Sequence, residues 1–353
     1  MKRVILTVAC LTVAVLAAPS AGAAGGRAPW SGLLAHIPDQ AVYRDYVVMN
    51  DYDAARAAIG APDPSGARER TTQLNELVIE AGLAPNQLFT TAREADIVEE
   101  LGFRPSAIGR DAAAGIGPKA LTILQGDEVD RDEIQDAAES DSVWSDELTV
   151  KSHAGTDYLS WGDEGIDPKR ITPVRRLGQG GRLAIDPPFL TWTTRTAPMK
   201  ASLEAAAGDR PSLADDTIFQ ELDAEMTDVG AFATFMHEGP IEIDEDVRAD
   251  SDVGAAALVP YAAIATGAGW DEDQPVAFIV LLHDDESSAT DNCERLRTGL
   301  ETGTSVTRAP WSELATDATV ECEGTVVTAT FTPSSPRLWY SAVLQREPLL
   351  AAG

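Results

Sequence analysis

A strand–acidic turn–helix pattern that occurs twice constrains the fold of this chain more than any other feature. "ALTILQGDEVDRDEIQDAA" (120–138) and "AFIVLLHDDESSATDNCERL" (277–296) both pass from an apolar run through carboxylates into an amphipathic segment. Two further runs typical of strands follow each of them, which gives the order β-α-β-β at about 119–162 and about 276–332. The repetition predicts an internal duplication, in an α+β fold whose helices cover one face of mainly antiparallel sheets.

The rest of the chain divides around these two units. Residues 24–118 carry apolar stripes at helical spacing and predict a mainly helical N-terminal region. Residues 119–241 then form a first α+β unit and residues 242–353 a second, joined by the charged tract 242–252. Further predictions are a hairpin turning at Pro187-Pro188, a hairpin around residues 270–274, and a terminal strand at 337–346.

The first 23 residues predict export. Lys2 and Arg3 precede an apolar run of about 15 residues, and Ala21-Gly22-Ala23 has the arrangement of a cleavage site, so we expect a signal peptide cleaved near Ala23. The run is shorter than the ~20 residues of a spanning helix. A lipoprotein signal at Cys10 is the weaker alternative, because the apolar run continues beyond it and Thr7 stands where leucine is preferred. We therefore expect a secreted or cell-envelope protein without a membrane span in its mature chain.

The charge of the chain excludes one class of partner. The sequence has 57 acidic and 27 basic residues, a formal net charge of −30, so its surface repels nucleic acid and anionic lipid. Only five of the basic residues are lysine, which fits a salty habitat or a GC-rich genome equally well. A nucleic-acid-binding role is therefore not expected.

The acidic clusters at the two turns predict helix caps. Aspartate at a helix N-terminus accepts hydrogen bonds from unpaired amides and favours the positive end of the helix dipole. Calcium binding is the alternative, but neither cluster has the spacing of an EF-hand loop. We predict no metal site at these carboxylates, which are Asp127, Asp130, Asp132, Asp284, Asp285 and Glu286.

The remaining motifs indicate no catalytic or cofactor-binding residues. His283 beside two aspartates could orient a metal or a proton, but one histidine at a strand end is more often structural. His36, His153 and His237 share no ligand spacing, which argues against zinc. "GQGGRL" (178–183) lacks the end of a phosphate loop and predicts a flexible turn. We therefore name no catalytic, cofactor-binding or metal-binding residue.

Cysteines and carboxylates lead to two further predictions, a disulfide and an alternative function as a hydrolase. Cys293 and Cys322 remain after signal cleavage and predict one disulfide in an oxidising compartment. Carboxylate pairs for glycoside hydrolysis could converge in three dimensions. Packing explains the tryptophans as well as a sugar platform does; these are Trp144, Trp161, Trp192 and Trp270.

Three stretches of the sequence resemble a known group of proteins. These are "ILQGDEVDRDEIQDAA", "YLSWGD" and the segment that contains "SLADD" at Ser212–Asp216. They are similar to an uncharacterised family of bacterial secreted or lipid-anchored envelope proteins with a GDFD strand–helix junction and an SLADD helix start. The junction here reads Gly126-Asp127-Glu128-Val129, without the phenylalanine. The resemblance extends over roughly residues 40–345 and implies a cell-envelope protein of unknown activity, with no catalytic residues.

These observations favour a non-enzymatic binding or structural module, with an envelope or extracellular partner that the sequence does not identify. A secreted hydrolase that depends on carboxylates is the first alternative, and a calcium-stabilised structural module is the second. Whether the protein is an enzyme stays open, with the motifs favouring that it is not.

Overall fold

The computed structural model describes residues 30–61, 76–86, 88–89, 93–127, 129–242, 257–271 and 274–352. Residues 1–23, where a signal peptide is predicted, lie outside the described residues. Nearly all of the charged tract 242–252 also lies outside them.

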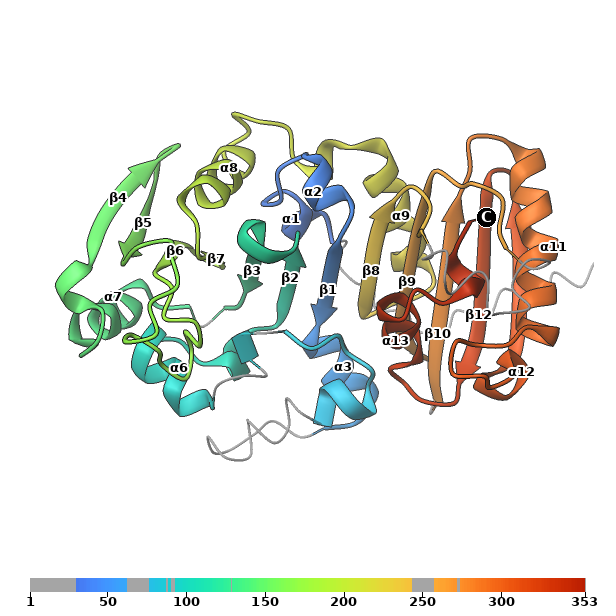
Figure 1. Cartoon of the computed structure of the whole chain (residues 1–353), viewed down its shortest axis with the longest axis horizontal. Coiled ribbons are helices and arrows are strands. Elements are labelled where there is room, and N and C mark those ends of the chain that lie inside the picture. Colours follow the sequence, from blue (N-terminus) through green and yellow to red (C-terminus); the bar gives the residue numbers. More distant parts are fainter. Residues whose placement is uncertain are drawn as a thin grey trace, which may run out of the picture.

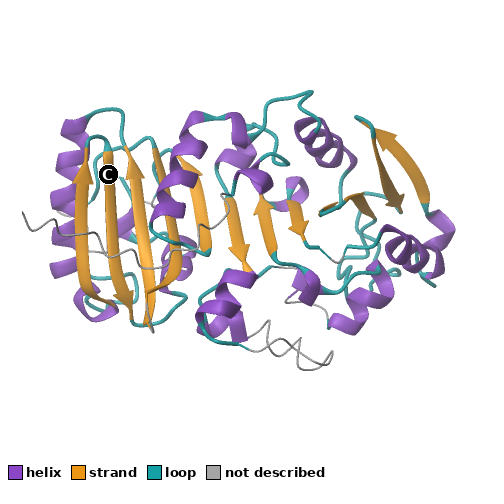
Figure 2. Cartoon of the chain, turned by 180° about the vertical axis from the view of Figure 1, so that it is seen from behind, coloured by secondary structure: helices purple, strands orange, loops and turns teal. Residues whose placement is uncertain are grey.

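One antiparallel sheet of twelve strands runs along the whole molecule (Figures 1 and 2). Its order from one edge to the other is β11 (Ala315–Glu323), β12 (Val326–Pro333), β10 (Gln274–Leu282), β9 (Ala263–Asp271), β8 (Ala233–Glu238), β1 (Val47–Asp51), β2 (Arg110–Ala114), β3 (Leu121–Gln125), β7 (Phe189–Thr193), β6 (Gly181–Asp186), β5 (Thr156–Trp161) and β4 (Thr149–His153). The predicted α+β class with antiparallel pairing is confirmed.

One topology occurs twice, on either side of the β1–β8 pair. Each time three strands run as a meander, β1-β2-β3 or β8-β9-β10, and a helix follows, α7 (Arg131–Ser140) or α11 (Glu286–Thr302). A later strand then returns beside the third one: β7 pairs with β3, and β12 pairs with β10. The strands that come directly after α7, β4 and β5, lie instead at the far edge, because β4 to β7 form a meander that runs back toward β3.

Helices cover both faces of the sheet, which corrects the expectation of one covered face. Successive strand residues point to opposite faces of the sheet. In β1, Val48 joins the first hydrophobic core, on one face, while Val47 and Met49 join the second core, on the other face. α1 (Ser31–Leu34) and α9 (Thr217–Asp228) pack in the second core. The first core holds α6 (Glu94–Leu101), α7, α11 and α13 (Leu338–Leu344).

The N-terminal region is only partly helical. It contains α1, α2 (Ala41–Arg44), α3 (Tyr52–Ala58) and α6, but it also supplies β1 and β2 at the centre of the sheet. β1 is buried along its whole length and so lacks the polar–apolar alternation of a half-exposed strand. β2 reads "RDAAA", and alanine is a strong helix former. β2 therefore lacks a strand-like sequence, and β1 lacks the alternation that marks a half-exposed strand.

The predicted terminal strand is wrong, because residues 338–344 form helix α13. Trp339, Tyr340, Ala342 and Val343 are buried, and the 3.6-residue helical period brings these four to one side, against the first core. The prediction at Pro187-Pro188 is confirmed, with a cis bond between the two prolines in the β6–β7 hairpin. α8 (Thr196–Ala206) follows that hairpin.

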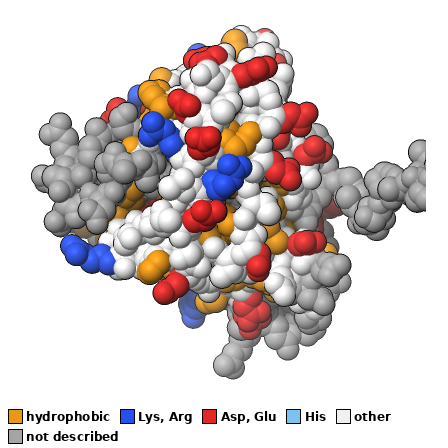
Figure 3. Space-filling model, turned by 90° about the vertical axis from the view of Figure 1, so that its right-hand side faces the viewer, with side chains coloured by type: hydrophobic (Ala, Val, Ile, Leu, Met, Phe, Trp, Pro, Cys, Tyr) orange, Lys and Arg blue, Asp and Glu red, His pale blue; other side chains and the backbone are white. Residues whose placement is uncertain are grey.

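Acidic side chains are spread over the end of the sheet that carries β11 and α11 (Figure 3). β11 is exposed along most of its length and contains Asp317, Glu321 and Glu323. Charged side chains on an edge strand oppose pairing with another chain. Within the described ranges, the helices are too short or too polar to cross a bilayer.

Candidate binding loop and its tryptophan cage

The acidic clusters begin helices, as predicted. The carboxylate of Asp130 accepts hydrogen bonds from the amides of Asp132 (2.8 Å) and Glu133 (3.2 Å) at the start of α7. That of Asp285 accepts from the amide of Ser288 (2.9 Å) at the start of α11. Asp127 and Asp284 are exposed beside these caps. The described part of the chain contains no group of three or more histidine, cysteine or acidic side chains placed to hold a metal ion.

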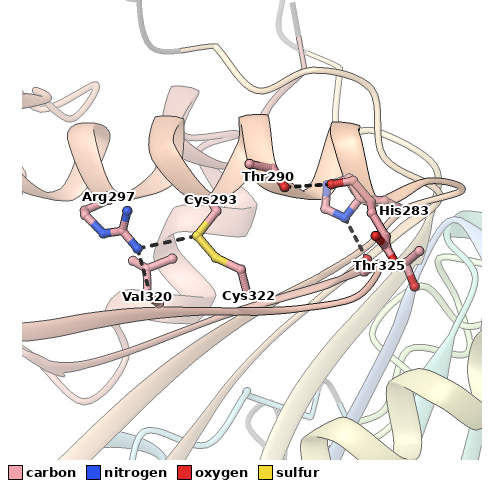
Figure 4. Close-up of a disulfide and its surroundings, with 8 residues drawn as sticks. His283, Thr290, Cys293, Arg297, Val320, Cys322 and Thr325 are labelled. Carbon is pink, nitrogen blue, oxygen red and sulfur yellow. Dashed lines mark hydrogen bonds between the residues drawn. A yellow bond between two sulfur atoms is a disulfide. The ribbon is translucent and has the colours of Figure 1, made fainter.

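His283 has a structural role beside the disulfide (Figure 4). Its Nδ1 lies 3.0 Å from the carbonyl oxygen of Thr325, and its Nε2 lies 2.8 Å from the side-chain amide of Asn292. Burial lowers the pKa of the imidazole, so the neutral ring donates at Nδ1 and accepts at Nε2. The predicted Cys293–Cys322 disulfide is present and joins α11 to β11.

The other three histidines lie apart from one another. His36 is buried against the ring of Phe189, and burial lowers its pKa to about 4. His153 contacts Glu204 at 2.8 Å, and Nδ1 of His237 lies 2.7 Å from the carbonyl oxygen of Asp45. Each of these histidines has its own local partner.

The most unusual cluster lies under the loop that joins β5 to β6, residues 162–180, which Figure 1 draws in yellow-green near α6 and α7. Three of the four tryptophans named from the sequence meet there. Trp144 comes from the turn after α7, Trp161 from the end of β5 and Trp192 from β7. Trp270 lies elsewhere, on β9. We call Trp144, Trp161 and Trp192, with the carboxylates of Glu100 and Asp141, the tryptophan cage.

Arg175 of the loop fills this cage. The central carbon of its guanidinium lies 4.6, 5.1 and 6.0 Å from the ring centroids of Trp161, Trp144 and Trp192, within the range of cation–π attraction. The side chain is surrounded almost completely, since Arg175 is 5% exposed. Three aromatic faces around one cation indicate a site shaped for a planar positive group.

Two carboxylates complete the cage. Nε of Arg175 lies 3.0 Å from Glu100, and Nη1 lies 3.7 Å from Asp141. Burial lowers the pKa of Arg175 to about 10, although both carboxylates oppose that change. Burial also raises the pKa of Glu100, with the charge of Arg175 opposing it. The ion pair is thus held in a low-dielectric interior, where each charge depends on the other.

Glycines bring the loop ends against the indole rings. A Cβ on Gly162 would lie 2.2 Å from the ring of Trp144, and one on Gly181 would lie 2.5 Å from the ring of Trp192. Gly178 has a positive φ of 58°, and its Cβ would meet the carbonyl oxygen of Asp167. The segment 178–183, predicted as a flexible turn, is therefore closely packed, because only glycine fits these contacts.

Hydrogen bonds close the loop on itself. The amide of Gly180 donates to the carbonyl of Asp163 (2.9 Å), and the amide of Asp167 donates to the carbonyl of Leu177 (3.2 Å). At the base, Nε of Arg182 donates to the hydroxyl of Thr196 (3.0 Å). These bonds join residues of the loop to one another and to its base, so the loop is packed as a compact unit.

The outer surface of the loop carries several exposed apolar side chains. Ile166 is 62% exposed, Ile171 55% and Leu177 53%. Pro168 and Pro173 are exposed between them. Large aliphatic side chains gathered on one short exposed segment are typical of an interaction site. We call this surface the apolar loop face; it consists of Ile166, Pro168, Ile171, Pro173 and Leu177.

Asp111 is a buried acid outside the cage, and its carboxylate is held by three side chains. Asp111 accepts from the side chains of Asn50 (2.8 Å), Tyr52 (2.7 Å) and Asn86 (2.5 Å), and burial raises its pKa to about 6. Asp111 is enclosed and ties β2 to β1 and to the segment before α6. A separate hollow of about 350 Å³ lies between α11 and β11, and its wall includes Arg297.

The sequence did not point to Arg175. "PVRRLGQGG" contains two adjacent arginines, and nothing local shows that the first is buried while the second is exposed. The available signals were a loop rich in glycine and proline between two strands, a tryptophan directly before it and another on the second strand after it.

Comparisons with known proteins identify no family. No family model matches the chain, and no curated protein matches it. Among solved structures, crystal forms I and III of TP0453 are similar to this chain at 12% identity, with TM-scores of 0.40 and 0.44. The matches cover 90% and 91% of this chain and 98% of TP0453.

Proposed function

We propose that this protein is an exported, non-enzymatic binding module of the cell envelope that holds a protein partner through the apolar loop face. The envelope location rests on the predicted signal peptide. The observation that carries the proposal is the concentration of exposed aliphatic side chains on one anchored loop.

The exposed aliphatic side chains are concentrated in one segment of the chain. The described residues include eight large hydrophobic side chains with high exposure, and three of them lie within residues 166–177. The other five are distributed over separate segments of the chain; these are Ile79, Val98, Ile116, Val150 and Leu344. Single exposed hydrophobic residues are normal on protein surfaces, but a gathered set indicates a contact surface.

The loop is held rigid before it meets a partner. Arg175 fixes it from below in the tryptophan cage, and Nη1 of Arg195 and Nη2 of Arg182 contact Glu164 near its start, at 3.3 and 3.6 Å. A preorganised loop loses little conformational entropy on binding, which favours affinity. The fixed inner side and the exposed outer side therefore serve one purpose, to present the apolar loop face.

Charge indicates the chemistry of the partner. Two basic side chains, Lys169 and Arg176, and one acidic side chain, Asp163, are exposed on the loop, while the chain as a whole carries a net charge of −30. A partner surface that combines apolar side chains with carboxylates would match this loop and be repelled by most of the remaining surface. Such complementarity sets orientation and raises the association rate.

Differential capture tests this proposal. The variant I166S/I171S/L177S is compared with the matched control I116S/V150S/L344S, which removes three exposed aliphatic side chains from separate segments of the chain. Both variants and the wild type are immobilised and exposed to envelope extract of the source organism. We expect one protein to be retained by the wild type and the control and lost from the loop variant. Equal retention by all three would refute the proposal.

A further inference from the structure

We propose that the tryptophan cage is a binding site for a guanidinium group from another molecule, and that Arg175 occupies it in competition with that ligand. When the ligand enters, Arg175 leaves and loop 162–180 is released. This inference goes beyond the proposed function and is tested on the purified protein alone.

The cage has the composition of a cation site. Three indole faces and two carboxylates surround one point, and they come from five separate elements of the chain: α6, the C-terminal end of α7, the turn after it, β5 and β7. Aromatic faces attract cations, and guanidinium stacks on them better than ammonium because it is planar and weakly hydrated. The chemical class of the ligand is therefore an alkylguanidinium.

Arg175 leaves several hydrogen-bond donors of the cage unpaired. Its Nε and Nη1 have no acceptor in hydrogen-bond geometry, although Glu100 lies at ion-pair distance. The Nε1 groups of Trp144 and Trp161 are also buried without an acceptor. Unpaired buried donors are unfavourable, and guanidinium binds carboxylate best as a bidentate, aligned pair. A ligand that is free to rotate can align where Arg175, held by its backbone, does not.

The segment that carries Arg175 can leave as a unit. The amide of Arg175 donates to the hydroxyl of Thr172 (2.9 Å), and the amide of Thr172 donates to the carbonyl of Arg175 (3.2 Å). These two bonds hold the turn together whether or not the cage is filled. Pro173 and Arg176 of this segment are exposed, so Arg175 enters the cage directly from the surface.

Release would break the contacts of Arg175 in the cage and those of Thr172 and Arg170, including the ion pair of Arg170 with Glu147. The hydroxyl of Thr172 donates to Glu100 (2.8 Å), and the guanidinium of Arg170 lies 4.7 Å from the ring centroid of Trp144 and contacts Asp146 at 3.1 Å. Asp146 is largely exposed, and exposed ion pairs contribute little to stability. The apolar loop face would then lose its fixed shape, which couples ligand binding to the presentation of that face.

The first experiment is a titration of R175A with ethylguanidinium chloride at millimolar concentrations. Ethylammonium chloride and sodium chloride at equal ionic strength are the controls. We expect ethylguanidinium alone to change the tryptophan emission saturably and to raise the melting temperature. The double variant R175A/W161L should lose this response. If ethylguanidinium acts no differently from ethylammonium, the cage is not a guanidinium site.

The second experiment uses the wild type and needs no folded variant. Hydrogen exchange of residues 162–180 is followed with ethylguanidinium and with a blocked tetrapeptide that contains one arginine. We expect exchange in this loop to rise at least threefold with one of the two ligands. The ligand that causes this rise shows whether the cage takes its guanidinium group from a free cation or from a peptide. If neither ligand changes the exchange, competition with Arg175 is refuted, even where R175A binds ethylguanidinium.

Discussion

Glu347 should make the stability of this protein decrease as the pH rises toward neutrality. The residue follows α13 and is 3% exposed, and both of its carboxylate oxygens accept from the single amide of Val306, at 3.2 and 3.0 Å. Burial raises its pKa to about 7 from an ordinary value of 4.5. The folded state therefore holds a proton that the unfolded state has released at intermediate pH.

The sign and size follow from these two values. Because the folded pKa lies above the unfolded one, the favourable contribution of protonated Glu347 is complete below pH 4.5 and is lost as the pH rises to about 7. At roughly 1.4 kcal/mol for each pH unit between the two values, the loss reaches about 3 kcal/mol. E347Q keeps an acceptor for the amide of Val306 and cannot ionise, so it should be spared this loss.

Urea unfolding at pH 5, 6, 7 and 8 measures the effect. We expect the free energy of unfolding of E347Q to be close to that of the wild type at pH 5 and to exceed it by about 3 kcal/mol at pH 8. E294Q, a change at an exposed glutamate of α11, is the matched control and should differ from the wild type by a similar small amount at every pH. A constant difference between E347Q and the wild type across the series would refute the reasoning.

Three further predictions concern stability. Reduction of the Cys293–Cys322 disulfide should lower the free energy of unfolding by about 3 kcal/mol, as measured by urea titration with and without reductant, and an unchanged midpoint would contradict this. His36 is buried and neutral with a pKa of about 4, so its contribution to the free energy of unfolding is present above pH 6.5 and lost as the pH falls toward 4. H36F should therefore make the free energy of unfolding less dependent on pH between 6.5 and 4. An unaltered slope in urea unfolding over this pH range would argue against this role. D130A should cost about 1 kcal/mol by removing the cap of α7, whereas D136A on the exposed side of that helix should cost less, and equal losses in thermal melts would count against the cap.

A large part of this fold could be predicted from residues that are close together in the sequence. The order of strand, acidic turn and helix around Asp130 and Asp285 was predicted because a cap and its helix lie within four residues of each other. The disulfide followed from having two cysteines in a chain expected to be exported. These features depend on local hydrogen bonds or on simple pairing, so composition and spacing suffice to predict them.

Tertiary structure alone decided the central strands and the candidate site. β1 is buried on both faces because a hydrophobic core lies on each side of the sheet at this point, and no pattern within five residues expresses that. Arg175 becomes buried only because α6, α7, β5 and β7 bring three tryptophans and two carboxylates to one point under its loop. The sequence determined which residues could attract a buried cation, and long-range packing determined which arginine they surround.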